Sequence, residues 1–349
     1  MTIMLQPMDQ ERGPDRRRRG LILLLLLLLF LGALGAFILL ISRGDAPRAS
    51  LPGVLGIDAG GKPKFDRVVA GVGRPIDVAV SPDGSKIYAI ESYGSYAVKV
   101  FDSKGKPLAD AVPPHTTEGT RQPMAIATAP DGAVYVTDRV LRQVLIYNAD
   151  GTFREVFRPV GFGDWAPLGI AVDEDGLVYV TDTLDIPGQP QTPETPGTPA
   201  IERHRVYVFN PDGSLVRWFG QKGAGAKELM FPEHLAIDGK GRIWVADVTG
   251  VKVFDSEGNY VFRLGAEGDA GTSLPGGLAY AGGRMYVTDV TNHRAMVFDV
   301  SGDTPVFKAQ FGELGFGNGQ FRFPAGIAAS ASRIYIANRE NGRIDTWTK

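Results

Sequence analysis

The stretch LPGGLAYAGGRMYVTDVTNHRAMVFD, Leu274–Asp299, contains the pattern that decides the fold. It consists of an apolar strand opened by Pro275, a Gly-rich turn, a second strand ending in Val-Thr-Asp, a short loop and a third strand. Short runs of β-branched and aromatic residues separated by tight turns are typical of antiparallel hairpins. The stretch therefore predicts consecutive antiparallel strands.

The same unit recurs from Pro75 onward at a spacing of roughly 40–50 residues, which is typical of propellers. A fourth, less regular strand completes most copies, and no sustained helical periodicity follows Ile41. Six four-stranded sheets packed around an axis bury the sheet faces that a single sheet leaves exposed. We therefore predict an all-β fold, a six-bladed β-propeller of four-stranded antiparallel blades over residues 53–349. The six copies open with RPIDVAV, QPMAIAT, APLGIAV, FPEHLAI, LPGGLAY and FPAGIAA.

The two ends of the repeat region predict how the ring closes. The sixth copy stops at Lys349, just after its third strand, whereas Val54–Gly71 resembles a displaced turn and fourth strand. We therefore expect the N-terminal segment to supply the outer strand of the last blade. Val54–Asp58 also resembles a third strand, so the number of exchanged strands stays open at this point.

The N-terminus carries a hydropathy signal of its own. Four arginines, Arg16 to Arg19, precede the uncharged apolar run Leu21–Ile41, which as a helix would be about 30 Å long, enough to cross a bilayer core. We predict a transmembrane signal anchor at 21–41 after a basic N-terminus at 1–20, with a linker at 42–52. A cleaved secretory signal peptide is the alternative, but such peptides have shorter apolar regions. The arginines place the N-terminus in the cytoplasm and the propeller on the extracytoplasmic side of the membrane.

Composition excludes several functional classes. The chain has 349 residues, a formal net charge of -2 and no cysteine. The near-neutral charge argues against nucleic acid as a partner, since such partners usually require a basic patch. The lack of cysteine excludes disulfides, thiolate catalysis and Cys-ligated zinc. No P-loop, Gly-x-Ser-x-Gly, His-Glu-x-x-His or calcium-loop motif is present.

At TNHRAMVFD, Thr291–Asp299, the chain resembles the NHL-repeat family, named after an Asn-His-Leu triplet in this loop. The links Gly220–Asp238 and Gly312–Ala328 resemble that family's connectors between blades, and the resemblance covers about residues 53–349. It implies a six-bladed propeller of a kind that mostly binds proteins, RNA or small ligands. Blades one (GSYAVKVF) and four (TGVKVF) depart from the triplet.

Comparison of the six copies separates architectural residues from unusual ones. Because every second strand ends in a carboxylate or an amide, we interpret this acidic ring as a set of acceptors for loop backbone and not as a cation site. His204 and His293 occupy the triplet position of the resembled family, so we interpret both as structural. The ring consists of Glu91, Asp138, Asp182, Asp247, Asp289 and, in the sixth blade, Asn338.

Two blades carry polar residues where a crowded propeller axis calls for small ones. Asp77 in blade one and His234 in blade four occupy a position held by Gly or Ala in the other copies, and Glu233 precedes His234. Blades one and four are opposite in a ring of six, so we expect these residues to face each other at the channel mouth. Such a group can orient a polar ligand or exchange protons, although a single unusual histidine is more often a solvated side chain.

Two insertions indicate which face of the propeller binds a ligand or partner. The connector AVPPHTTEGTRQP adds His115 and Arg121 as further candidate ligand-binding residues, although a solvated histidine is the simpler reading of His115. The Pro-rich arm Pro187–Pro199 extends a loop of blade three, and its composition is typical of an exposed, semi-extended segment. We expect both insertions on the face where the innermost strands begin, together with His234. A tolerated loop insertion is the alternative for the arm.

These features together predict a membrane-tethered extracytoplasmic propeller that binds a protein or small ligand through its loop-rich face, as a recognition module or scaffold without chemistry of its own. The alternative is a propeller enzyme, a lyase or hydrolase of a small polar substrate at the channel mouth. A purely structural member of an envelope complex is a third option. The resemblance includes peptidyl-hydroxyglycine lyases, whose zinc histidines come from several blades, but here only one blade offers a histidine there. We expect no cofactor, and a metal at the channel mouth stays open.

Overall fold

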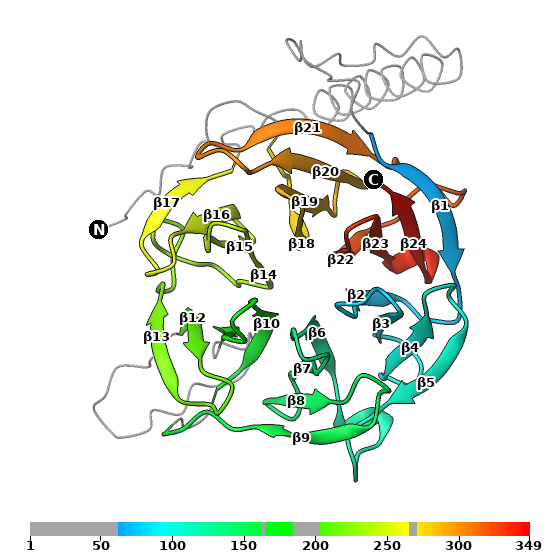
Figure 1. The fold of residues 1–349 in the computed structure, drawn as a ribbon, viewed down its shortest axis with the longest axis horizontal. Coiled ribbons are helices and arrows are strands. Elements are labelled where there is room, and N and C mark those ends of the chain that lie inside the picture. The colour runs from blue at the N-terminus through cyan, green and yellow to red at the C-terminus, as the bar shows by residue number, and fades with distance from the viewer. Residues whose placement is uncertain (1–61, 162–164, 184–202, 265–270) are drawn as a thin grey trace, which may run out of the picture. The chain divides into compact units, whose positions relative to one another are not determined.

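A computed structural model describes residues 62–161, 165–183, 203–264 and 271–349. Within these ranges the chain forms six four-stranded antiparallel sheets arranged around a central axis (Figure 1). The predicted six-bladed propeller is therefore confirmed. The predicted anchor at 21–41 and the arm at 187–199 lie outside the described residues. In the part of the chain that is described, no helix has the length and apolarity needed to cross a membrane.

The first three blades follow one another along the chain. Each blade runs from an innermost strand beside the axis to an outermost strand on the perimeter (Figure 1). A short 3-10 helix, η1 (Glu118–Thr120), lies in the connector between blades one and two. Their strands are β2 (Pro75–Val80), β3 (Lys86–Glu91), β4 (Val98–Asp102) and β5 (Pro107–Ala111); β6 (Pro123–Thr128), β7 (Val134–Asp138), β8 (Gln143–Tyr147) and β9 (Phe153–Phe157); and β10 (Pro167–Val172), β11 (Val178–Thr183), β12 (His204–Phe209) and β13 (Leu215–Phe219).

The last three blades continue the same order, except that the sixth takes its outermost strand from the other end of the chain. A second 3-10 helix, η2 (Arg339–Asn341), lies between the second and third strands of blade six. Their strands are β14 (His234–Ile237), β15 (Ile243–Asp247), β16 (Gly250–Phe254) and β17 (Tyr260–Arg263); β18 (Pro275–Ala281), β19 (Arg284–Asp289), β20 (Arg294–Asp299) and β21 (Val306–Phe311); and β22 (Pro324–Ala329), β23 (Arg333–Asn338), β24 (Arg343–Thr348) and β1 (Lys64–Val69).

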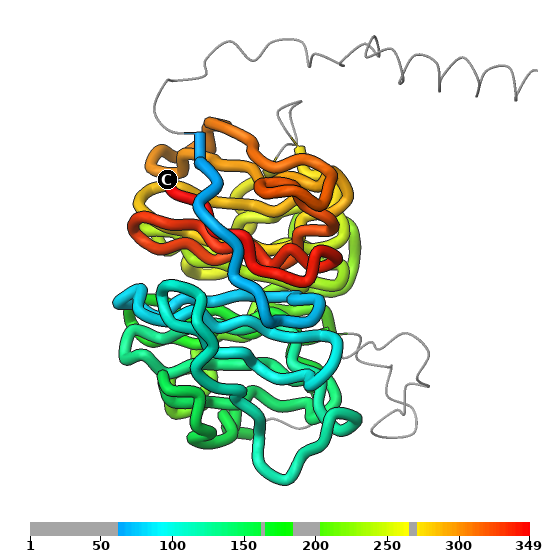
Figure 2. The backbone as a smooth tube through the Cα atoms, turned by 90° about the vertical axis from the view of Figure 1, so that its right-hand side faces the viewer, coloured from blue at the N-terminus to red at the C-terminus, as the bar shows by residue number. Residues whose placement is uncertain are grey.

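The ring closes as the sequence predicts. Strand β1 pairs antiparallel with β24, from Lys64 opposite Thr348 to Val69 opposite Ile344. Figure 2 shows β1, in blue, running beside the C-terminal strand β24, in red. The sixth blade therefore contains one exchanged strand, and the possible second one, Val54–Asp58, lies outside the described residues.

Turn chemistry explains why the hairpins form where they do. In the turn between β16 and β17, the Asp255 carboxylate accepts hydrogen bonds from the backbone N–H groups of Glu257 and Asn259. Gly258 completes this turn at φ 85°, a left-handed conformation that glycine adopts without a Cβ clash. The DSEGN stretch thus encodes its turn locally, before any packing between blades.

The hydrophobic core is divided among the contacts between neighbouring blades. Six clusters of buried apolar side chains are found, and each joins the facing sheets of two adjacent blades. The cluster between blades six and one includes Val69 of β1 with Phe101 and Tyr335. Every blade therefore depends on two neighbours for burial of its faces, which makes closure of the ring a condition for stability.

Candidate functional site

The innermost strands approach each other so closely that most blades require a small residue at the channel. A Cβ atom built on Gly326 of blade six would lie 2.5 Å from the Cα atom of Asp77. A Cβ built on Gly169 of blade three would lie 2.5 Å from the carbonyl oxygen of Glu233. Contacts this short are not tolerated, so the glycines follow from packing, and Asp77 and His234 are real departures from the local rule.

Threonine hydroxyls link adjacent blades around this ring. In blade two, Thr137 Oγ1 accepts a hydrogen bond from the Ala125 N–H and donates one to the Leu168 carbonyl of blade three. Thr181 and Thr288 make the same bridge from blades three and five. Val-Thr-Asp, which ends the second strand in these blades, therefore serves to join blades.

Blade one joins its neighbour through Asp77 instead. Asp77 Oδ2 accepts a hydrogen bond of 2.9 Å from the Ile126 N–H of blade two, and Oδ1 accepts one of 2.9 Å from the Val78 N–H. The residue equivalent to the bridging threonine is Ile90, which has no hydroxyl. Asp77 thus has a structural role between blades, and its two oxygens keep further acceptor capacity.

His234 meets Asp77 in the channel, as the sequence predicts. Its Nδ1 lies 4.0 Å from Asp77 Oδ2, and the two side chains are 16% and 6% exposed. Within the residues that the structure describes, the imidazole makes no hydrogen bond. The strands β2 and β14 therefore bring together, in a nearly closed space, two titratable groups that lie far apart in the sequence.

Burial inverts the ordinary acidities of the pair. Desolvation raises the pKa of the Asp77 carboxyl to about 7, although the backbone N–H groups of Ile126 and Val78 oppose the shift. Desolvation also lowers the pKa of the His234 imidazole to about 4. At neutral pH the histidine is therefore uncharged, while Asp77 is close to its midpoint and can both donate and accept a proton.

Stability should consequently depend on pH through these two groups in opposite directions. Because the pKa of Asp77 rises from 3.8 to about 7 on folding, its contribution is full below pH 3.8 and is lost as the pH rises to 7. Because the pKa of His234 falls from 6.5 to about 4, its contribution is full above pH 6.5 and is lost as the pH falls to 4.

Urea unfolding of single variants between pH 4 and 8 separates the two contributions. Relative to Asp77→Asn, the native protein should lose stability as the pH rises from about 4 to 7. Relative to His234→Gln, it should gain stability as the pH rises from about 4 to 6.5. Glu118→Gln, at an exposed position in the connector between blades one and two, is the control for general effects of removing a carboxylate. A pH-independent difference for both channel variants would contradict the inverted acidities.

The third predicted residue, Glu233, lies beside His234 but differs in environment. Its side chain reaches solvent, yet desolvation by the surrounding protein raises the pKa of its carboxyl, while the charges of Arg139 and Arg339 act to lower it. These arginines belong to blades two and six, the two neighbours of blade one. Sequence reasoning missed both, although the other blades have uncharged residues at the equivalent position.

The other two predicted residues lie elsewhere. His115 is exposed in the connector, with φ 59°. Arg121 is buried and donates hydrogen bonds to the carbonyl oxygens of Ser95, Tyr96 and Thr116, so it fastens the connector to blade one. Among the described residues, no hydrogen bond or ion pair joins either side chain to Asp77 or His234.

The acidic ring is structural, as expected. Asp138 accepts hydrogen bonds from the backbone N–H groups of Gln122, Val140 and Leu141. In four other blades the carboxylate also lies within 4.0 Å of a cation, which neutralises it. These pairs are Glu91–Lys99, Asp182–Arg203, Asp247–Lys252 and Asp289–Arg294.

The two triplet histidines are structural as well. The Phe323 N–H donates a hydrogen bond of 3.0 Å to His293 Nδ1, and the Phe231 N–H donates one of 3.2 Å to His204 Nδ1. Each phenylalanine has a left-handed φ near 50° and packs against the histidine ring. The histidines therefore stabilise the strained residue that precedes the Pro motif of the following blade.

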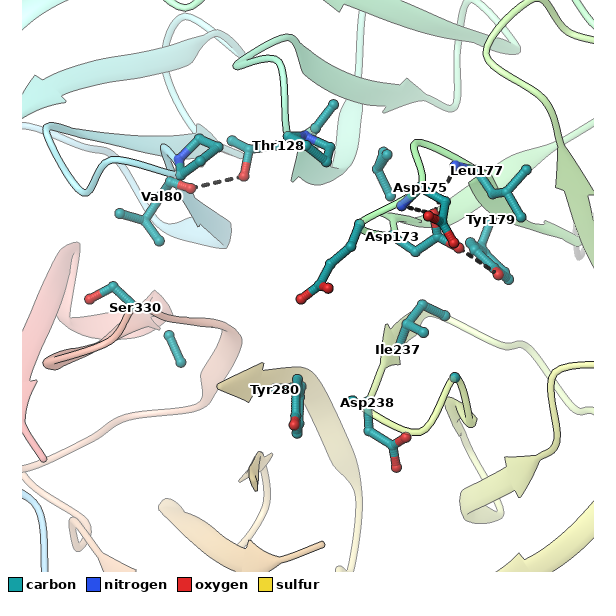
Figure 3. Close-up of a pocket in the computed structure, with 18 of the residues that line it drawn as sticks. Val80, Thr128, Asp173, Asp175, Leu177, Tyr179, Ile237, Asp238, Tyr280 and Ser330 are labelled. Atoms are coloured by element: carbon teal, nitrogen blue, oxygen red, sulfur yellow. Dashed lines mark hydrogen bonds between the residues drawn. The ribbon is translucent and has the colours of Figure 1, made fainter. Parts of the chain in front are cut away.

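A cavity of about 680 Å³ occupies the opposite end of the channel, where the innermost strands end. Turns from several blades line it, and Figure 3 shows Asp173, Asp238, Tyr280 and Ser330 around its opening. The carboxylates of Asp173 and Asp238 accept hydrogen bonds from their own turns, at Leu177 and at Arg242. The sequence analysis did not predict this cavity, although the turn DEDGL, which contributes three acidic residues to its lining, is visible in the sequence.

No protein-family model matches the chain. Among solved structures, a catalytically inactive virginiamycin B lyase from Staphylococcus aureus with quinupristin is similar at TM-score 0.54 and 14% identity, over 82% of this chain and 100% of that one. A streptogramin B lyase has TM-score 0.52 and 12% identity, over 82% and 96%. Kuenenia stuttgartiensis hydrazine synthase has TM-score 0.52 and 15% identity, over 84% and 99%.

Identities this low show the propeller fold alone. They do not show membership of the NHL-repeat family, which stays a prediction, and the same architecture serves unrelated activities. Within the described residues, no group of three or more His, Asp or Glu side chains converges as metal ligands would.

Proposed function

We propose that the protein is a recognition module or scaffold that binds a protein partner through the face where the innermost strands begin. In this proposal the apolar run at 21–41 tethers the propeller to a membrane, with the propeller on the extracytoplasmic side. The observation that supports it is the distribution of exposed apolar side chains. Large exposed apolar patches rimmed by polar residues mark interaction sites.

Exposed apolar residues concentrate in the connectors and in the loops between second and third strands. Backbone hydrogen bonds, such as Val248 N–H to the Met230 carbonyl, join these two kinds of segment. Other exposed apolar residues of the described chain lie on outermost strands, and none lies in the turns at the opposite end of the channel. The loop-face residues are Tyr93, Val112, Val140, Val248, Leu314, Phe316 and Phe323, whereas the exposed Val160 hydrogen-bonds to the turn between β12 and β13 at Gly213.

Aromatic truncations on this face should weaken partner binding. Tyr93 and Phe316 are 65% and 70% exposed, and loss of an aromatic anchor from the centre of an interface costs about 2 kcal/mol or more. We therefore expect the double variant Tyr93→Ser, Phe316→Ser to lose the protein that co-purifies with the cross-linked membrane-bound form. Trp218→Ser, which removes a half-exposed aromatic side chain from outermost strand β13, is the matched control. Equal recovery of the partner with both variants would contradict the proposal.

A propeller enzyme acting on a small polar substrate at the channel mouth is the second candidate function. The environment of Asp77 favours it, because a carboxyl with a pKa of about 7 can both donate and accept a proton at neutral pH, while the uncharged imidazole of His234 can hydrogen-bond a substrate. Turnover of a small substrate that disappears in His234→Ala would support this function over binding alone.

A further inference from the structure

The channel end around Asp77 and His234 has the chemistry of a small-molecule site. Both side chains are largely buried, and they take the place of the small residues found in the other blades. The Asp77 oxygens each accept one backbone hydrogen bond and can accept another. The neutral imidazole of His234 can donate one hydrogen bond and accept one. A buried imidazole without a hydrogen bond is unfavourable unless a ligand or water satisfies it.

The spacing of the pair matches a single bridging group. At 4.0 Å, His234 Nδ1 and Asp77 Oδ2 are too far apart for a direct hydrogen bond. An oxygen atom between them can lie at about 2.8 Å from both atoms, which is a normal hydrogen-bond length. A hydroxyl group suits this position, since it donates one hydrogen bond and accepts another.

The rim of the channel supplies charge. Arg139 and Arg339 come directly after the second strands of blades two and six, the two neighbours of blade one, where the remaining blades have Ser, Thr or Val. Both act electrostatically on Glu233 of blade four, so the three charged groups share one end of the channel. Arg339 also has an acidic partner, because its Nε lies 3.8 Å from Oε1 of the partly buried Glu340. Among the described residues Arg139 forms no ion pair within 4.0 Å, so its guanidinium favours an anionic ligand and matches the geometry of a carboxylate.

We propose that this end of the channel binds a small hydroxylated carboxylate. The ligand's hydroxyl group bridges Asp77 and His234, and its carboxylate lies towards Arg139 and Arg339. This site lies at the same end of the channel as the proposed protein-binding loops, but it uses polar groups in the channel instead of their exposed apolar side chains. It requires no reaction, so it does not depend on the enzyme alternative.

Titration calorimetry of the full chain in detergent tests the proposal with three probes. D-glucuronate carries both hydroxyl and carboxylate groups, D-glucose carries only hydroxyl groups, and acetate carries only a carboxylate. We expect saturable binding of D-glucuronate, with D-glucose and acetate each binding roughly tenfold or more weakly, because each lacks one set of hydrogen bonds.

Two variants assign the two halves of the site. His234→Ala restores a residue type that blade two carries as Ala125, so it should fold, and it should weaken D-glucuronate binding roughly tenfold. Arg139→Gln should weaken D-glucuronate while leaving the weak binding of D-glucose unchanged. Arg154→Gln, on the outer strand β9, is the control and should bind like the native protein.

Three results would overturn the proposal. The first is no D-glucuronate binding by the native chain, and the second is unchanged binding in His234→Ala. The third is D-glucose binding as tightly as D-glucuronate, which would exclude the carboxylate from recognition. Loss of partner recovery in the loop-face variant leaves this titration unaffected, so the two proposals fail independently.

Discussion

Deletion of strand β1, residues 64–69, will open the propeller and remove most of its stability. The strand supplies the outermost position of blade six, and its Val69 belongs to the cluster between blades six and one. Without it, the edge of β24 loses its hydrogen-bonded partner and Phe65 no longer covers Trp347. Because whole domains are stable by only about 5–15 kcal/mol, we expect the free energy of unfolding to fall by about 5 kcal/mol or more.

Thermal unfolding, followed by circular dichroism and tryptophan fluorescence, measures this effect. The tryptophan emission should shift to longer wavelength in the deletion variant, since Trp347, one of four tryptophans, is only 5% exposed in the closed propeller. Lys64→Ala, an exposed substitution at the start of the same strand, should leave the unfolding temperature unchanged. A deletion variant that unfolds at the native temperature would show that blade six is stable with three strands.

Lys252→Met should cause the largest loss of stability among the charge substitutions considered. Lys252 and Asp247 are 1% and 2% exposed, and Lys252 Nζ lies 3.2 Å from Asp247 Oδ2 and donates a hydrogen bond to the Glu228 carbonyl. Removing one partner leaves the other charge buried and uncompensated, which typically costs about 3–5 kcal/mol. Urea unfolding at neutral pH measures the loss.

Two controls separate the buried charge from lost packing. Lys99→Met breaks the equivalent pair of blade one, where Lys99 is more exposed and also pairs with Asp110, so its effect should be clearly smaller. The double variant Lys252→Met, Asp247→Asn removes both charges and should recover part of the loss, since blade six carries Asn338 at this position. If the double variant is as unstable as Lys252→Met, packing and not the uncompensated charge is responsible.

Comparison of the six sequence repeats predicted the candidate site better than the chemical type of individual residues did. It identified Asp77 and His234, because packing enforces small residues at the equivalent positions, as Gly326 shows by its approach to Asp77. It did not predict that Arg121 holds the connector against blade one, because no sequence pattern marks an arginine whose guanidinium donates hydrogen bonds to loop carbonyl groups. Arg139 and Arg339 were detectable by the same comparison, but their relation to Glu233 appears only when the blades are placed around the axis.

The sequence by itself determined the blades and their closure. Period-two strands, Asp-Gly turns and a missing fourth strand at Lys349 are local signals, and local hydrogen bonding such as that of Asp255 enforces them. Only the tertiary structure decided how polar groups from different blades meet. Ring geometry sets the 4.0 Å between Asp77 and His234, shifts both pKa values by desolvation, and opens the cavity at the other channel end. Distance and burial between blades depend on the closed ring, which no single repeat contains.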